Sequence, residues 1–134
     1  MALLNPYIAF DGTTAEAMDF YQSVFGGELT LNTYSEYGDT GPTGNLVMHS
    51  MLETRDGMIL MASDVPPGTP HRQGDNVSIC LSGDENTGLR AIWQALIDGG
   101  TVTQALETQP WGDDYGSCID RFGIVWRVNI NRNT

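Results

Sequence analysis

His49 is the side chain with the clearest chemical potential, because an imidazole titrates near neutral pH and also ligates metals. It stands midway along a β-prone run in which alternation places Val47, His49 and Met51 on one face. On a ligand-facing surface it could act as a general base, or hold a metal with Glu53, Asp64 or a carboxylate of the Asp113-Asp114 pair. Alternatively, it is a half-buried histidine hydrogen-bonded to a neighbour. The spacing leaves both interpretations open.

A second group of candidate side chains combines aromatic rings, hydroxyl and amide groups and one arginine. Trp111 and Tyr115 stand beside glycines, which allow close backbone approach, so we expect them to border a pocket. Arg127 follows in a predicted strand and, if it points inward, favours a carboxylate or phosphonate. Asn76 and Ser78 would add polar contacts. These five residues form the ligand site that the sequence predicts.

The charge balance excludes several classes of partner. Seventeen acidic residues against six basic ones, all arginine and none in a run, give a net charge of −11. We therefore expect no nucleic acid and no membrane surface as a partner. No apolar run approaches the ~20 residues of a membrane span, and no secretory signal is visible, so we expect a cytoplasmic protein. Cys80 and Cys118 lack the spacing of a zinc or redox motif, and we expect both to be reduced and buried.

The first half of the chain reads as one strand, one helix and three strands. A capping box at Thr13 and Glu16 predicts the helix start, and Gly26 and Gly27 predict its end. The predicted strands cover residues 6–10, 28–34, 46–54 and 58–63. A Pro-rich link, residues 65–74, follows.

The second half repeats this order. A strand over residues 76–82 should turn Val77, Ile79 and Leu81 toward a helix, which Asp84 caps and Gly99-Gly100 ends. Three strands follow over residues 101–108, 115–119 and 124–130, where we expect Phe122 and Trp126 to stabilise the last hairpin. Aligning the glycine pairs also pairs Phe20 with Trp93 and Val24 with Ile97. The sequence thus predicts an α+β fold, a single domain of two βαβββ modules, residues 1–64 and 75–134, whose curved mixed sheet forms a concave cleft.

Several short motifs, taken in order, resemble one known family. They are Pro6 to Gly12, Phe20-Tyr21, Phe25 to Gly27, Val47 to His49, and the closing run from Pro110 through Asp120 and Phe122 to Trp126. Together with the duplicated order they resemble the PhnB-like branch of the vicinal oxygen chelate superfamily, which includes glyoxalase I, bleomycin-resistance proteins and extradiol dioxygenases. The resemblance implies the glyoxalase/bleomycin resistance/dioxygenase fold and a homodimer.

The same resemblance bears on metal binding. Enzymes of the superfamily hold a divalent metal with side chains from the first and last strands of both modules, and those positions fall near Asn5, Leu60, Asn76 and Arg127 here. Leucine cannot ligate a metal, and arginine repels a cation. We therefore expect no glyoxalase-type metal site and predict no cofactor, while a divalent metal at a relocated site remains the alternative.

Three hypotheses of function follow. The first is binding or sequestration of a small organic molecule, anionic or aromatic, in the cleft. The alternative is a metal-dependent lyase, isomerase or dioxygenase that uses His49. The third is a structural or regulatory dimer without a ligand. The sequence does not decide whether the protein is an enzyme.

Overall fold

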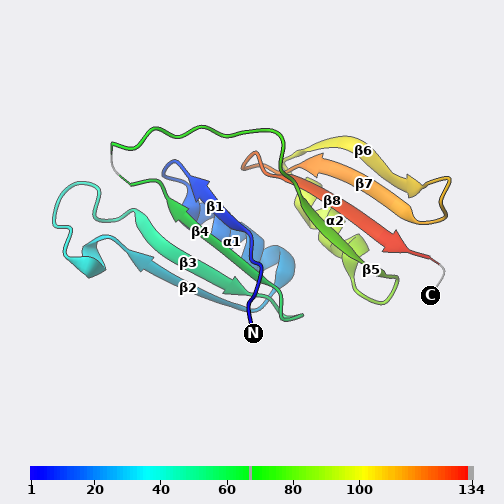
Figure 1. Cartoon of the computed structure of the whole chain (residues 1–134), viewed down its shortest axis with the longest axis horizontal. Coiled ribbons are helices and arrows are strands. Elements are labelled where there is room, and N and C mark those ends of the chain that lie inside the picture. Colours follow the sequence, from blue (N-terminus) through cyan, green and yellow to red (C-terminus); the bar gives the residue numbers. More distant parts are fainter. Residues whose placement is uncertain (67, 133–134) are drawn as a thin grey trace. The chain divides into compact units, whose positions relative to one another are not determined.

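A computed structural model describes residues 1–66 and 68–132, so that Pro67 of the predicted link lies outside the described residues. The chain divides into two compact units, residues 1–73 (module 1) and 74–134 (module 2). Within each module a four-stranded sheet carries one α-helix on one of its faces (Figure 1). Neither helix of the described residues has the length and apolar composition that a membrane span requires.

Both modules follow the predicted βαβββ order. Module 1 contains β1 (Tyr7–Phe10), α1 (Thr14–Phe25), β2 (Glu28–Thr33), a short 3-10 helix η1 (Ser35–Tyr37), β3 (Val47–Glu53) and β4 (Ile59–Asp64). Module 2 contains β5 (Ile79–Asp84), α2 (Leu89–Ile97), β6 (Thr101–Thr108), β7 (Asp114–Ile119) and β8 (Val125–Asn131). The sheet orders are β1-β4-β3-β2 and β5-β8-β7-β6, with β1–β4 and β5–β8 parallel and the other pairs antiparallel. The predicted α+β class is confirmed.

Each sheet has a face covered by its helix and an opposite face, here called the open face. Burial alternates strictly along β4 and along β8, as expected when successive side chains point to opposite faces. Leu60 and Ala62 of β4 are buried on the α1 side, and Trp126 and Val128 of β8 are buried on the α2 side. The open faces carry the half-exposed residues between them.

The start of α1 is not the capping box that the sequence predicts. The Thr13 side chain makes no capping hydrogen bond. Instead, the buried Asp64 carboxylate accepts hydrogen bonds from the Thr14 amide at 3.1 Å and the Thr14 hydroxyl at 2.7 Å. Its other oxygen accepts from the Val47 amide at 2.8 Å. A carboxylate from the end of β4 therefore fulfils the acceptor role that a local Thr13 hydroxyl would otherwise have had.

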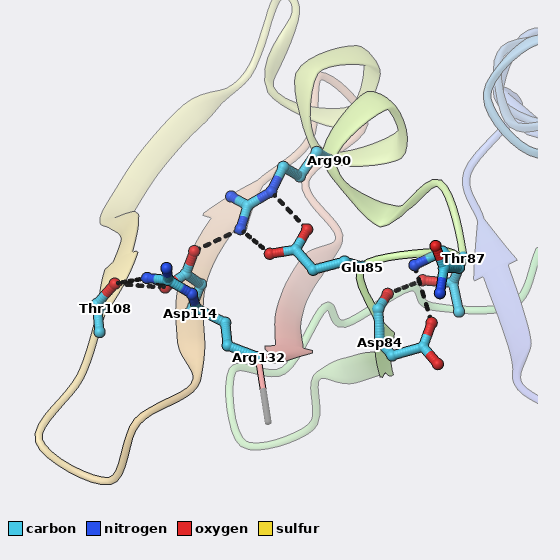
Figure 2. A network of polar contacts seen from close by, with 8 residues as sticks. Asp84, Glu85, Thr87, Arg90, Thr108, Asp114 and Arg132 are labelled. Carbon is cyan, nitrogen blue, oxygen red and sulfur yellow. Dashed lines mark hydrogen bonds and ion pairs between the residues drawn. The ribbon is translucent and has the colours of Figure 1, made fainter. Parts of the chain in front are cut away.

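The start of α2 also differs from prediction. Asp84 ends β5, accepting from the Asn86 amide at 2.9 Å and, through its carbonyl, from the Thr87 hydroxyl at 2.7 Å (Figure 2). These bonds form a turn, and the helix begins only at Leu89. Val77, predicted to face that helix, is 78% exposed because β5 begins two residues after it.

Each helix is followed by a glycine that packs closely against the backbone at the end of a strand. A Cβ on Gly27 would overlap the Glu53 carbonyl oxygen, and a Cβ on Gly100 would overlap that of Ile119. The glycine pairs are thus structurally equivalent, as the repeat predicts. The predicted match of Phe20 with Trp93 fails, because Trp93 is buried and Phe20 is only half-buried. Gly26 follows α1 directly, whereas Asp98 stands between the end of α2 and Gly99. This additional residue rotates the buried face of α2 relative to its glycine pair.

Candidate functional site

His49 lies on the open face of module 1 and contacts an aromatic neighbour. Its Nδ1 is 3.4 Å from the Tyr7 hydroxyl, and the two rings stack with centroids 5.9 Å apart. Of its predicted acidic companions, Asp64 is on the helix-covered side and committed to α1, whereas Glu53 is exposed. Within the part of the chain that the structure describes, no three His, Cys, Asp or Glu side chains are grouped so as to hold a metal ion.

Two of the four glyoxalase-type metal positions, Leu60 and Arg127, do not fit a divalent cation. Leu60 faces α1 and is 4% exposed, so the open-face positions beside it belong to Ile59 and Met61, which offer no nitrogen or oxygen donor. On the last strand of module 2, the open-face position is the cationic Arg127. The donor chemistry at Leu60 and Arg127 therefore opposes a metal there.

Arg127 is the centre of a polar cluster on the open face of module 2. It donates a hydrogen bond from Nε to the Ser78 hydroxyl at 2.8 Å, and from Nη1 to the hydroxyl oxygen of Tyr115. Both partners are neutral. No carboxylate in residues 1–66 or 68–132 forms an ion pair with Arg127. The guanidinium is therefore fixed in place while its charge is left uncompensated.

The two other predicted ligand residues behave differently. Trp111, at the tip of the β6–β7 hairpin, is 59% exposed and lies edge-on to Tyr115, with ring centroids 6.1 Å apart. Asn76 is exposed, and among the described residues no hydrogen bond joins it to the Arg127 cluster. The structure therefore brings together four of the five residues that the sequence proposed.

Asp120 holds together the end of the closing motif, the run from Pro110 to Trp126. Its buried carboxylate accepts hydrogen bonds from the Phe122 amide at 2.8 Å, the Ile124 amide at 3.1 Å and the Trp126 indole nitrogen at 2.8 Å. Trp126 is 1% exposed. The motif thus closes the turn between β7 and β8 and anchors Trp126 in the core of module 2, while its earlier part, Trp111 and Tyr115, reaches the open face.

An ion-pair network at the start of β7 was not foreseen. Asp114 accepts from the Thr108 hydroxyl at 2.6 Å, and its Oδ2 is 2.5 Å from Arg90 Nη2 (Figure 2). Arg90 also contacts Glu85 at 2.7 Å, and Arg132 lies 3.5 Å from Asp114. The bond from Thr108, followed by that from Arg90, lowers the pKa of Asp114. Arg90, which helical periodicity assigns to a solvated face, is therefore part of this network.

The two cysteines differ in environment. Cys118 is fully buried, and burial raises its pKa to about 11, so it stays a thiol at neutral pH. Cys80 is exposed, contrary to the prediction, because its register partner is Arg127 and both therefore point to the open face. Neither cysteine forms a disulfide.

Two βαβββ modules, each with one helix-covered and one open sheet face, define the fold of the glyoxalase/bleomycin resistance/dioxygenase superfamily. A domain of that description from Frankia sp. has a TM-score of 0.69 at 14% identity, covering 99% of this chain and 93% of that one. A PhnB protein of Bacillus cereus has a TM-score of 0.76 at 20% identity, with 96% and 99% covered. At these identities the likeness shows the fold and not the activity.

The family follows from the sequence comparison. The family model described as 3-demethylubiquinone-9 3-methyltransferase matches residues 3–129, and the chain belongs to this family. A protein of known structure from Pseudomonas aeruginosa is 29% identical with a TM-score of 0.88, covering 99% of this chain and 100% of that one. The predicted resemblance to the PhnB-like branch is confirmed.

Proposed function

We propose that the protein binds a small organic anion, a carboxylate or a phosphonate, on the open face of module 2. The observation that carries the proposal is the uncompensated guanidinium of Arg127, held by Ser78 and Tyr115. In a chain of net charge −11, a cation without a carboxylate partner favours an external anion. The family description names methyl transfer, whereas these side chains favour binding of an acid.

The hydrogen-bonding capacity of the cluster supports this choice of ligand. Ser78 and Tyr115 both accept from Arg127, so each hydroxyl keeps its own hydrogen to donate. The guanidinium keeps further N–H groups, and its fork matches the oxygens of carboxylate and phosphonate. Asp113, the acid beside this hairpin, is bonded to Asn129 at 2.9 Å rather than to Arg127.

Calorimetric titration with methylphosphonate and with acetate tests the proposal. We expect Arg127→Gln to weaken binding by about 10-fold or more, because a hydrogen bond to a charged group is worth about 1.5–3 kcal/mol. Arg55→Gln is the matched control, since Arg55 is an exposed arginine of module 1, and it should leave binding unchanged. Equal affinities in wild type and Arg127→Gln would refute the proposal.

The second candidate function is a metal-dependent enzyme that uses His49, and the contact between His49 and Tyr7 favours it. The imidazole is held at Nδ1, which leaves Nε2 for a substrate proton or a ligand. Metal content measured in wild type and in His49→Ala separates the two candidates. Equal content would count against the enzyme hypothesis, and loss of a stoichiometric metal would support it.

The family resemblance also leads us to propose a homodimer. The outer strand β6 supports it, because every residue but Leu106 is exposed and Glu107 is its one charged side chain. A weakly charged edge is where two copies of a strongly acidic chain repel each other least. Light scattering should give the mass of two chains, and the mass of one chain at every concentration would reject it.

A further inference from the structure

Trp111 and Tyr115 form an aromatic corner beside the proposed anion site. Their ring planes are inclined by 61° with centroids 6.1 Å apart, an edge-to-face arrangement that leaves ring surface open. Tyr115 is also the residue whose hydroxyl accepts from Arg127. The guanidinium and the aromatic corner thus share one side chain, and the width of a single phenol ring sets the distance between them.

The loop of the β6–β7 hairpin, which carries Trp111, is held by hydrogen bonds. The Gln109 amide donates to the Asp113 carbonyl at 2.8 Å, and the Gly112 amide donates to the Gln109 carbonyl at 2.9 Å. At the base of the hairpin, Asp114 is held by Thr108 and Arg90 (Figure 2). The exposed indole is therefore carried by a hydrogen-bonded loop with a fixed base. A ring presented in this way loses little conformational entropy when a ligand packs on it.

We infer that the ligand of module 2 is an aryl acid, a planar aromatic ring joined directly or through one carbon to a carboxylate or phosphonate. The inference rests on the proposed function and adds the class of ligand to it. The acid would pair with Arg127, and the ring would then reach the corner, stacking on one aromatic side chain and meeting the edge of the other. Trp111 is the residue that determines this specificity.

The length of the ligand follows from the same geometry. Because Tyr115 contacts Arg127 through its hydroxyl and Trp111 through its ring, a ligand ring attached close to its acid lies over the corner. An aliphatic acid would pair with Arg127 and leave the indole in water.

The test compares phenylphosphonate with methylphosphonate by calorimetry in wild type, Trp111→Ala and Trp111→Phe. In wild type we expect the phenyl compound to bind about fivefold more tightly, the value of one aromatic contact. Trp111→Ala should lose most of this preference, since only the contact with Tyr115 remains, and Trp111→Phe should keep more of it. Because Trp111 is mostly exposed, both variants should fold normally.

The possible results of this titration distinguish failure of the aryl-acid inference from failure of the proposed anion site. If both phosphonates bind wild type equally, the aryl-acid inference is overturned and the anion site stands. If the phenyl preference is undiminished in Trp111→Ala, the assignment to Trp111 is wrong. If neither compound binds wild type, the anion site fails and the inference fails with it.

Discussion

Module 1 and module 2 share one topology but hold corresponding corners with different chemistry. In module 1 the buried carboxylate is Asp64, the last residue of β4, and its partners are two amides and a hydroxyl. The corresponding last residue of β8, the strand parallel to β5, is Asn131. Module 2 instead has a buried acid on the neighbouring strand, Asp114, whose charged partners are arginines. The comparison teaches that topology is retained while the polar group that secures it changes position and partner.

The open faces differ as well. Module 1 presents a tyrosine stacked on a histidine, whereas module 2 presents an arginine held by two hydroxyls. The chain thus contains one topology twice, and the two open faces carry groups of different charge. Only the second copy offers a fixed, uncompensated cation among the described residues of the two open-face clusters.

The glycines that follow the helices of both modules should be the positions most sensitive to substitution. A side chain at Gly27 or Gly100 would overlap a carbonyl oxygen of the adjoining strand, and both glycines lie where backbone cannot move freely. We expect Gly27→Ala and Gly100→Ala each to lower the free energy of unfolding by about 3 kcal/mol or more, measured by urea denaturation.

Gly57→Ala is the control for these two variants. Gly57 has a positive φ, as Gly27 does, but nothing lies within 4 Å of the position that a Cβ would take. Its cost should be about 1 kcal/mol, the conformational penalty alone. Equal effects at Gly57 and Gly27 would show that the close approach to backbone is not what fixes the helix ends.

The next largest loss of stability should follow substitution of Asp64, the buried acid of module 1. Asp64→Ala leaves three donors without their acceptor at a buried position, and we expect a loss of about 3 kcal/mol in the free energy of unfolding. Asp11→Ala, an exposed acid after β1, should change stability by less than about 0.5 kcal/mol. A loss at Asp64 no greater than that at Asp11 would mean that solvent replaces these bonds.

The contribution of Asp114, the ion-paired acid of module 2, to stability should depend on pH and should be the smallest of the three effects. Folding lowers the pKa of Asp114, so its contribution to stability is complete well above the ordinary aspartate pKa of about 3.9 and is lost as the pH falls through the lowered value. We expect Asp114→Asn to have a lower thermal midpoint than wild type at pH 7, by less than Asp64→Ala.

The difference in midpoint between wild type and Asp114→Asn should shrink as the pH is lowered from 4 toward 2. Asp75→Asn, at an exposed aspartate of the same module, should match wild type at both ends of the range. A difference that stays constant down to pH 2 would show that the ion pairs with Arg90 and Arg132 contribute nothing measurable.

The sequence predicted the elements whose signals are local. The order of strands, the glycine ends of both helices and the last hairpin follow from side-chain alternation and turn residues within short windows. Ser78, Tyr115 and Arg127 were among the proposed ligand residues, but their hydrogen bonds to one another were not predicted, because the sequence left open which way Arg127 points. The start of α1 was predicted correctly at Thr13, but its capping carboxylate, Asp64, lies far away in the sequence. The start of α2 was predicted too early, because Asp84 forms a turn instead of a helix cap.

The missed contacts depend on which residues the fold places opposite each other. Asp64 meets Thr14 from 50 positions away, and Arg90 meets Asp114 from 24. The exposure of Cys80 likewise depends on the register between β5 and β8. No window of neighbouring residues contains that information, since a shift of one position in register reverses every side chain of a strand.

The unequal burial of the three tryptophans has an optical consequence. Trp93 and Trp126 are 4% and 1% exposed, whereas Trp111 is 59% exposed. The fluorescence of the native protein should therefore contain a blue-shifted component from the two core indoles and a red-shifted component from the hairpin tip. A collisional quencher such as acrylamide should remove mainly the second. The unmodified chain thus carries an emission signal that reports on one corner of module 2 while its core signal stays constant.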